Sequence, residues 1–202
     1  MMVLGSFSIT CLYNKKERTK YQMEALECIK TRRSIRKFKD EPVAHETVDA
    51  IVEAASMAPS WKNTQITRYY VVENPDIKQE IADNCVLDFE FNQKTINRAP
   101  QLVVVGMVEK RCGYERDGSF STSKEDRWEM YDAGIASQTF CLAAHDMGVG
   151  TVILGIFDED KVAKAISLPE GQKVAALIAM GYPDQECEAP KRKTVEELVN
   201  YI

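Results

Sequence analysis

The longest helical pattern in the chain, from about residue 125 to 147, carries apolar residues on more than one face. Ile135, Phe140 and residues 142–144 do not fall on a single stripe of a helix. A helix that is apolar on several faces has to be covered on more than one side. We therefore expect this helix either at the centre of the domain or at an interface with another subunit.

Short runs of β-branched, aromatic and other apolar residues predict β-strands, because such side chains suit a pleated surface. The run at 102–105 has no polar residue, which is typical of a central strand covered on both faces. The order of strands and helices indicates a mixed α/β domain but leaves the sheet topology open. The predicted strands cover residues 69–72, 102–105, 151–154 and 174–180. Besides the long helix, the predicted helices cover 45–57, 158–166, a short segment after Met23 and a segment from Ile77, whose N-terminus Asn74 would cap.

The chain has 202 residues, 45% of them hydrophobic, which is enough for one well-buried domain. We place this domain at residues 23–202. Residues 1–22 are polar and lack periodicity. We interpret them as an appendage, either a real extension or the consequence of a misassigned start codon.

Composition argues against several classes of protein. The net charge of −5 disfavours nonspecific nucleic-acid binding. No apolar run reaches the roughly 18–20 residues of a membrane helix, and no charge pattern of a secretory signal precedes the first apolar stretch. The six cysteines include no C-x-x-C pair, and the two histidines form no metal-binding pattern. We therefore expect reduced thiols, no metal, no membrane segment and a cytoplasmic location.

Two short basic runs stand out in this acidic chain, at residues 32–37 and 191–193. Cations after a helix can simply offset the helix dipole, and a basic run after a proline is often a solvated tail. The alternative is an anion site, because guanidinium groups and a serine hydroxyl suit phosphate oxygens.

No familiar phosphate loop or catalytic elbow accompanies the basic runs. Gly148-x-Gly150 follows a helix rather than a strand, the reverse of a dinucleotide-binding motif, and there is no G-x-S-x-G sequence. The residues alone thus indicate an anion-binding α/β protein.

Four segments, in order, resemble the motifs of the nitroreductase family of FMN enzymes. They read T-R-R-S-I-R-K-F at 31–38, A-P-S-W-K-N-T-Q at 58–65, G-V-G-T-V-I-L-G-I-F-D at 148–158 and A-L-I-A-M-G-Y-P at 176–183. The resemblance extends from about Met23 to the C-terminus. It implies an α+β fold, with a mostly antiparallel central sheet between helices, and a homodimer that exchanges its C-terminal tails and binds FMN at the interface.

The resemblance also assigns roles by position. Arg32, Arg33 and Ser34 match residues that hold the FMN phosphate and ribityl chain, and Arg36 matches one nearer the flavin N1 and O2 edge. Three further groups would complete the site. Lys191, Arg192 and Lys193 would lie at the phosphate, and Leu154 and Gly155 would lie at the flavin, where the Gly155 N–H would donate to N5. A loop from the second subunit would contribute Pro59, Ser60, Asn63 and Gln65.

The implied activity is hydride transfer from NADH or NADPH, by a ping-pong mechanism, to small acceptors such as nitroaromatics or quinones. Two alternatives stay open. One is a dedicated reductase or dehalogenase of a single metabolite, with the polar excursion 109–127 as either a substrate lid or a solvated loop. The other is a flavin-binding carrier or sensor without turnover. Trp61, Trp128 and Tyr131 are candidates for ring stacking or for ordinary packing.

The chain departs from the family pattern in the walls near the flavin. After Gln65 the family often has proline and an aromatic residue, but this chain has Ile66, Thr67 and Arg68. In the third segment, the family's usual tryptophan before I-G-G is absent, and Ile156 stands in place of the second glycine of that stretch. These departures leave the acceptor open more than the cofactor.

Overall fold

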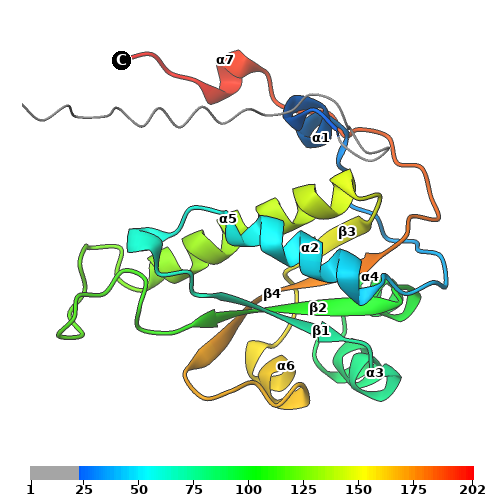
Figure 1. Ribbon diagram of the computed structural model, residues 1–202, viewed down its shortest axis with the longest axis horizontal. Coiled ribbons are helices and arrows are strands. Elements are labelled where there is room, and N and C mark those ends of the chain that lie inside the picture. The colour runs from blue at the N-terminus through cyan, green and yellow to red at the C-terminus, as the bar shows by residue number, and fades with distance from the viewer. Residues whose placement is uncertain (1–22) are drawn as a thin grey trace, which may run out of the picture.

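The computed structural model describes residues 23–202, so the predicted appendage at 1–22 lies outside the described residues. Its centre is a four-stranded sheet in the order β1-β2-β4-β3, antiparallel at each pairing, as the resemblance implied (Figure 1). The strands are β1 (Thr67–Val72), β2 (Gln101–Val108), β3 (Gly150–Leu154) and β4 (Gln172–Gly181). Each of the four predicted strands is therefore confirmed, with slightly wider bounds.

Helices cover both faces of the sheet. On one face lie α2 (His45–Ser56) and α5 (Arg127–Asp146), and on the other lie α3 (Pro75–Asn84), α4 (Glu90–Arg98) and α6 (Glu159–Ala165) (Figure 1). The short α1 (Ala25–Thr31) packs against α5, and the Cys28 thiol donates to the Leu142 carbonyl oxygen at 3.3 Å. Within residues 23–202, no helix has both the length and the apolar character to cross a bilayer.

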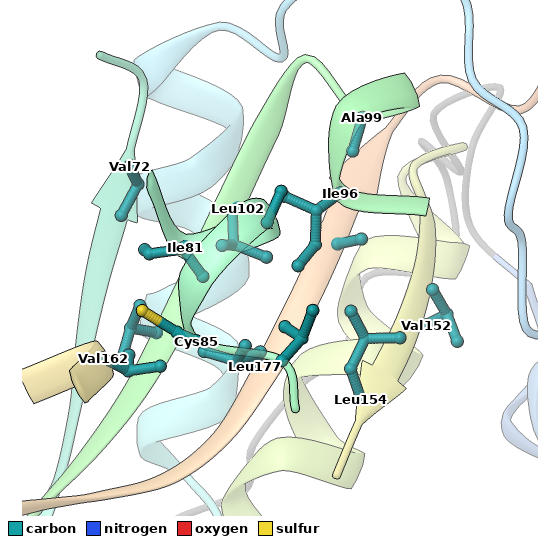
Figure 2. Packing of buried hydrophobic residues seen from close by; sticks show 14 of the residues in the cluster. Val72, Ile81, Cys85, Ile96, Ala99, Leu102, Val152, Leu154, Val162 and Leu177 are labelled. Atoms are coloured by element: carbon teal, nitrogen blue, oxygen red, sulfur yellow. The ribbon is translucent and has the colours of Figure 1, made fainter. Parts of the chain in front are cut away.

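The continuous apolar run of β2 is explained by burial on both sides. Leu102 and Val104 belong to the core beneath α3, α4 and α6, and Val103 and Val105 belong to the core beneath α2 and α5. Figure 2 shows side chains of the first of these cores, among them Ile81, Leu102 and Leu177. Burying each such side chain contributes about 1.5–3 kcal/mol, so the two cores dominate the stability of the domain.

Helix α5 is buried along one face, as predicted for a helix near the centre of the domain, and its role at an interface stays a prediction. Phe140, Cys141 and Ala144 are buried against α2 and the sheet, whereas Met130 and Tyr131 are 50% and 61% exposed. The helix is thus central along one face and leaves the side chains of Met130 and Tyr131 uncovered in a single chain.

Helix α4 was not predicted from the sequence. It is polar, with Asn92, Thr95 and Ile96 as its buried residues, and so it lacks a clear apolar stripe. Its place is set by tertiary contacts: Ile96 lies in the core, and the Asn92 amide donates to the Ile156 carbonyl oxygen at 3.0 Å. Most helical stability in proteins comes from such packing rather than from local preference.

The segment after α1 brings the two basic runs together. Ser34 forms a parallel bridge with Thr151 at the start of β3, and Phe38 forms an antiparallel bridge with Pro183 just after β4. This close approach requires glycine at position 150, because a Cβ there would lie 2.9 Å from Ile35 Cγ1. The C-terminal tail consequently leaves the sheet alongside the first basic run.

Candidate functional site

A cavity of about 500 Å³ lies where the two basic runs meet, and we call it the basic cavity. Of the residues predicted to bind FMN, it contains Arg32, Arg33, Ser34 and Arg192 from the predicted phosphate site, and Arg36, whose predicted place is nearer the flavin N1 and O2 edge. Its remaining lining residues are Cys187, Glu188 and Pro190. Lys191 and Lys193 do not line it and lie exposed on the tail.

The basic cavity is built to accept an anion. Within residues 23–202, no carboxylate forms a salt bridge with any of its four guanidinium groups. Arg33 Nη1 donates to the carbonyl oxygens of Lys30 at 2.7 Å and Arg32 at 3.0 Å, which fixes the guanidinium, yet its buried Nε has no hydrogen-bond partner. The oxygens of a phosphate group would accept a hydrogen bond from this buried donor and would offset the charge of the neighbouring arginines.

His145 lies beside this cavity and responds to its charge. Its Nε2 is 2.9 Å from the Thr31 hydroxyl oxygen. Burial, followed by the positive charges of Arg32 and Arg33, lowers the pKa of His145 below its ordinary value. The positive potential of the cavity therefore extends to a titratable group at its edge.

A second cavity of about 380 Å³, which we call the loop cavity, contains Pro59, Ser60 and Gln65. The rest of its lining is largely apolar and comes from α2, β1 and α5. The predicted site residue Asn63 is exposed and does not line it, although its side-chain oxygen accepts a hydrogen bond from the Gln65 amide at 3.1 Å. In one chain, the loop cavity shares no residue with the basic cavity.

Leu154 and Gly155 lie at the far end of β3 from the basic cavity. The Leu154 side chain is 5% exposed and packs in the core, so only its backbone can face a ligand. Gly155 is exposed, and a Cβ built on it would meet nothing within 4 Å. At about 3.3 Å per residue, β3 separates its two ends by about 13 Å, so an elongated ligand could extend along it from the basic cavity.

Aromatic side chains join the start of α5 to the loop at 59–65. The ring centroids of Trp61 and Trp128 are 5.0 Å apart, and those of Trp128 and Tyr131 are 5.5 Å apart. The three rings line a third cavity of about 290 Å³, the aromatic cavity. Trp61 and Trp128 are half-buried, whereas Tyr131 is exposed, so ring packing accounts for the first two and leaves Tyr131 available to a ligand.

Sequence reasoning missed two buried carboxylates at this place. Glu129 and Asp132 on α5 are 2% and 4% exposed. Asp132 lines both the loop cavity and the aromatic cavity. The only signal in the sequence is a pair of acids three residues apart on a helix that is otherwise rich in apolar residues.

The sequence profile described as the nitroreductase family matches residues 29–94 and 86–182. The chain belongs to this family. The matched residues include the first basic run, the loop 58–65 and strands β1 to β4, so the resemblance noted from the four motifs is confirmed.

Individual relatives are similar over most of their length. A Methanothermobacter thermautotrophicus protein, provisionally named an NADH dehydrogenase/NAD(P)H nitroreductase, is 32% identical over 80% of this chain and 78% of its own. The Bacillus subtilis FMN reductase [NAD(P)H] is 28% identical over 88% and 73%. The Nematostella vectensis iodotyrosine deiodinase is 24% identical over 92% and 77%.

Solved structures share the fold. A nitroreductase family protein from Clostridium novyi NT is 31% identical and superposes with a TM-score of 0.69, covering 80% of this chain and 86% of its own. An NADPH:FMN oxidoreductase from Vibrio harveyi, solved with NAD⁺, is 25% identical with a TM-score of 0.73, covering 88% and 76%. The α+β fold predicted from the motifs is thus that of the nitroreductase family.

Proposed function

We propose that this protein is an FMN-dependent NAD(P)H oxidoreductase that reduces small acceptors, such as nitroaromatics or quinones, by a ping-pong mechanism. The observation that carries the proposal is the meeting of the two basic runs in one cavity, in a chain of the nitroreductase family. When bound, FMN supplies hydride transfer from NADH or NADPH to an acceptor.

The residues of the chain would bind and orient the cofactor. Arg32, Arg33 and Ser34 would hold the phosphate, with Arg192 from the tail in support, because their donors line one cavity and, within residues 23–202, form no salt bridge with a carboxylate. Arg36 would lie near the N1 and O2 edge of the ring, and the Gly155 N–H near N5. Lys191 and Lys193 would contribute charge rather than direct contacts, since neither lines the cavity.

The site would be completed by a second copy of the chain. In one protomer the loop with Pro59, Ser60 and Gln65 borders a cavity separate from the basic one, as expected if this loop serves the partner's flavin. Figure 1 shows the tail leaving the body of the domain past α1. Its apolar residues Val195 and Leu198 are each 65% exposed, which favours an exchange of tails across a homodimer.

A dedicated reductase or dehalogenase of one metabolite is the second candidate. The deiodinase relatives and the folded excursion 109–127 favour it: the excursion contains a Tyr114–Phe120 bridge and reaches loop 59–65 through the Lys62–Glu115 ion pair at 3.0 Å. In this case the excursion would act as a lid over the aromatic cavity.

An anaerobic spectrum of the purified protein tests the proposed function. We expect a flavin spectrum that bleaches on adding NADH or NADPH and returns on adding a quinone or a nitroaromatic. Bleaching that is reversed only by a halogenated or other specialised substrate would favour the second candidate. A bound flavin that does not bleach would indicate a carrier or sensor, and a protein that cannot take up FMN would contradict the proposal.

The two histidines provide a second, spectroscopic prediction. The hydrogen bond and charge of Glu73 raise the pKa of His45, whereas burial and Arg32 and Arg33 lower that of His145. An NMR titration should therefore show two imidazole transitions on opposite sides of about pH 6.5. FMN should raise the pKa of His145 alone, because its phosphate offsets the arginine charges. An unchanged His145 at saturating FMN would place the phosphate elsewhere.

The sign of the stability effect follows from the same shifts. Because the pKa of His145 is lower in the folded chain, protons bind more strongly to the unfolded chain. The free energy of unfolding therefore decreases as the pH falls below the unfolded pKa of about 6.5. Saturating FMN should reduce this loss, because it raises the folded pKa.

A further inference from the structure

Loop 59–65 contains three non-glycine residues with left-handed backbone angles. They are Lys62 (φ 44°), Asn63 (φ 55°) and Gln65 (φ 48°). Such a conformation is unfavourable for a residue with a Cβ and persists only where the surrounding structure holds it. The loop therefore needs contacts that fix it in this form and in this place.

Hydrogen bonds inside the loop fix its form. The N–H groups of Asn63 and Thr64 donate to the carbonyl oxygens of Ser60 and Trp61 at 3.0 and 2.8 Å, and the Gln65 N–H donates to the Ser60 hydroxyl oxygen at 3.1 Å. These bonds close the loop on itself. They do not determine where the loop lies relative to the rest of the domain.

Among the contacts that tie this loop to α5 and the excursion, one hydrogen bond is to a buried carboxylate. Asp132 Oδ2, on a side chain that is 4% exposed, accepts the Trp61 N–H at 2.8 Å. The ion pair of Lys62 with Glu115 is a weaker tether, because the two side chains are 56% and 47% exposed and solvent screens them. The buried carboxylate is thus a stronger tether than this ion pair.

The same carboxylate oxygen also holds the excursion. Asp132 Oδ2 accepts the Cys112 thiol at 3.0 Å, and Cys112 is fully buried. Burial, followed by the neighbouring Asp132, raises the pKa of the Cys112 thiol, so it stays protonated and able to donate at neutral pH. One oxygen atom therefore joins loop 59–65 to the excursion 109–127.

Glu129, one helical turn before Asp132, is a natural comparison. It is 2% exposed, and its Oε1 accepts the Lys110 N–H at 2.7 Å. Glu129 thus anchors the start of the excursion and, within the described residues, makes no hydrogen bond to loop 59–65. The two carboxylates match in burial and in type of contact, and they differ in the segment they hold.

We propose that Asp132 is a positioning residue that fixes loop 59–65 against α5, and with it the flavin-facing side chains of Ser60 and Gln65. The statement about the flavin rests on the proposed function. The anchoring of the loop is a property of the chain without cofactor, so the two parts can be tested separately.

Amide hydrogen exchange of the flavin-free full chain tests the anchoring. Asp132→Ala should speed exchange in the peptide 58–66 by about tenfold or more, because the Trp61 N–H loses its acceptor. Asp132→Asn keeps an acceptor oxygen and should stay within about threefold of wild type. Glu129→Ala should speed exchange near Lys110 and leave the exchange of peptide 58–66 within about twofold of wild type.

FMN titration of the same variants tests the consequence for the site. We expect Asp132→Ala to raise the dissociation constant about tenfold, with near-complete rescue by Asp132→Asn and no change in Glu129→Ala. Asp132→Leu, which removes the acceptor but fills the volume, gives the same measurement if Asp132→Ala fails to fold.

The outcomes separate the two ideas. Equal effects of Glu129→Ala and Asp132→Ala on 58–66 would mean general destabilisation and would overturn the positioning role, as would unchanged exchange in Asp132→Ala and Asp132→Leu. Loss of loop protection without a change in FMN affinity would overturn the link to the flavin. A wild-type protein that binds no FMN, but shows the expected exchange pattern, would contradict the proposed function and leave the anchor intact.

Discussion

Replacing Arg33 by methionine is expected to weaken FMN binding by about 10-fold to 100-fold, because a charge-assisted hydrogen bond contributes about 1.5–3 kcal/mol and each 1.4 kcal/mol is about a factor of ten. Arg33 is the residue of choice because its Nη1 is already fixed by two carbonyl oxygens while its buried Nε lacks a partner. The preformed guanidinium gives a bound phosphate a donor without a large loss of side-chain freedom. Fluorescence titration with FMN measures the effect.

Riboflavin is the matched ligand for this experiment, because it carries the same ring without the phosphate. The Arg33→Met variant should bind riboflavin within about twofold of wild type, since only a phosphate contact is lost. Arg98→Met, at the exposed end of α4, removes the same charge away from the cavity and should change neither affinity. Equal weakening for FMN and riboflavin would show that Arg33 supports the fold of the site rather than the phosphate.

The sheet and most helices could be predicted because their local patterns agree with their environment. The strand at β2 is buried on both faces and reads as an unbroken apolar run, and the side chain of Asn74 caps α3 as expected, accepting from the Asp76 and Ile77 N–H groups. Helix α4 could not be found in the same way, because it is polar and its position depends on the core contact of Ile96.

The candidate site was predictable only in part, for a related reason. Motif resemblance named the arginines, but the meeting of Arg33 and Arg192 in one cavity depends on the bridges of residues 34 and 38 with β3 and the end of β4. Such long-range pairings have no local signal. Asp132 was missed because one acid on a helix gives no indication that its oxygen lies beside the backbone of residue 61.

Removing residues 194–202 is expected to convert a homodimer into monomers at micromolar concentration, with loss of bound FMN. The tail carries apolar side chains that are uncovered in a single chain: Leu198 is 65% exposed and Tyr201 is 94% exposed. Strand β1 is an edge of the sheet, and its residues line both the loop cavity and another cavity of about 510 Å³. An open edge of this kind is a site for strand addition, and an apolar tail is a suitable occupant.

The truncation retains the basic run at 191–193, so any loss of FMN would come from the missing partner and not from missing charge. Light scattering after size exclusion gives the oligomeric state, and the flavin absorbance of the same peak gives the occupancy. Leu198→Asp should reproduce the effect in the full-length chain, whereas Glu196→Ala, on the same short helix α7 (Val195–Leu198), should remain dimeric because it removes no apolar contact. A truncated protein that stays dimeric would contradict the role of the tail and would turn attention to other exposed apolar side chains, such as Met130 and Tyr131 of α5. A monomer that keeps FMN would show that one chain supplies the whole site and would refute the role of loop 59–65 across the interface.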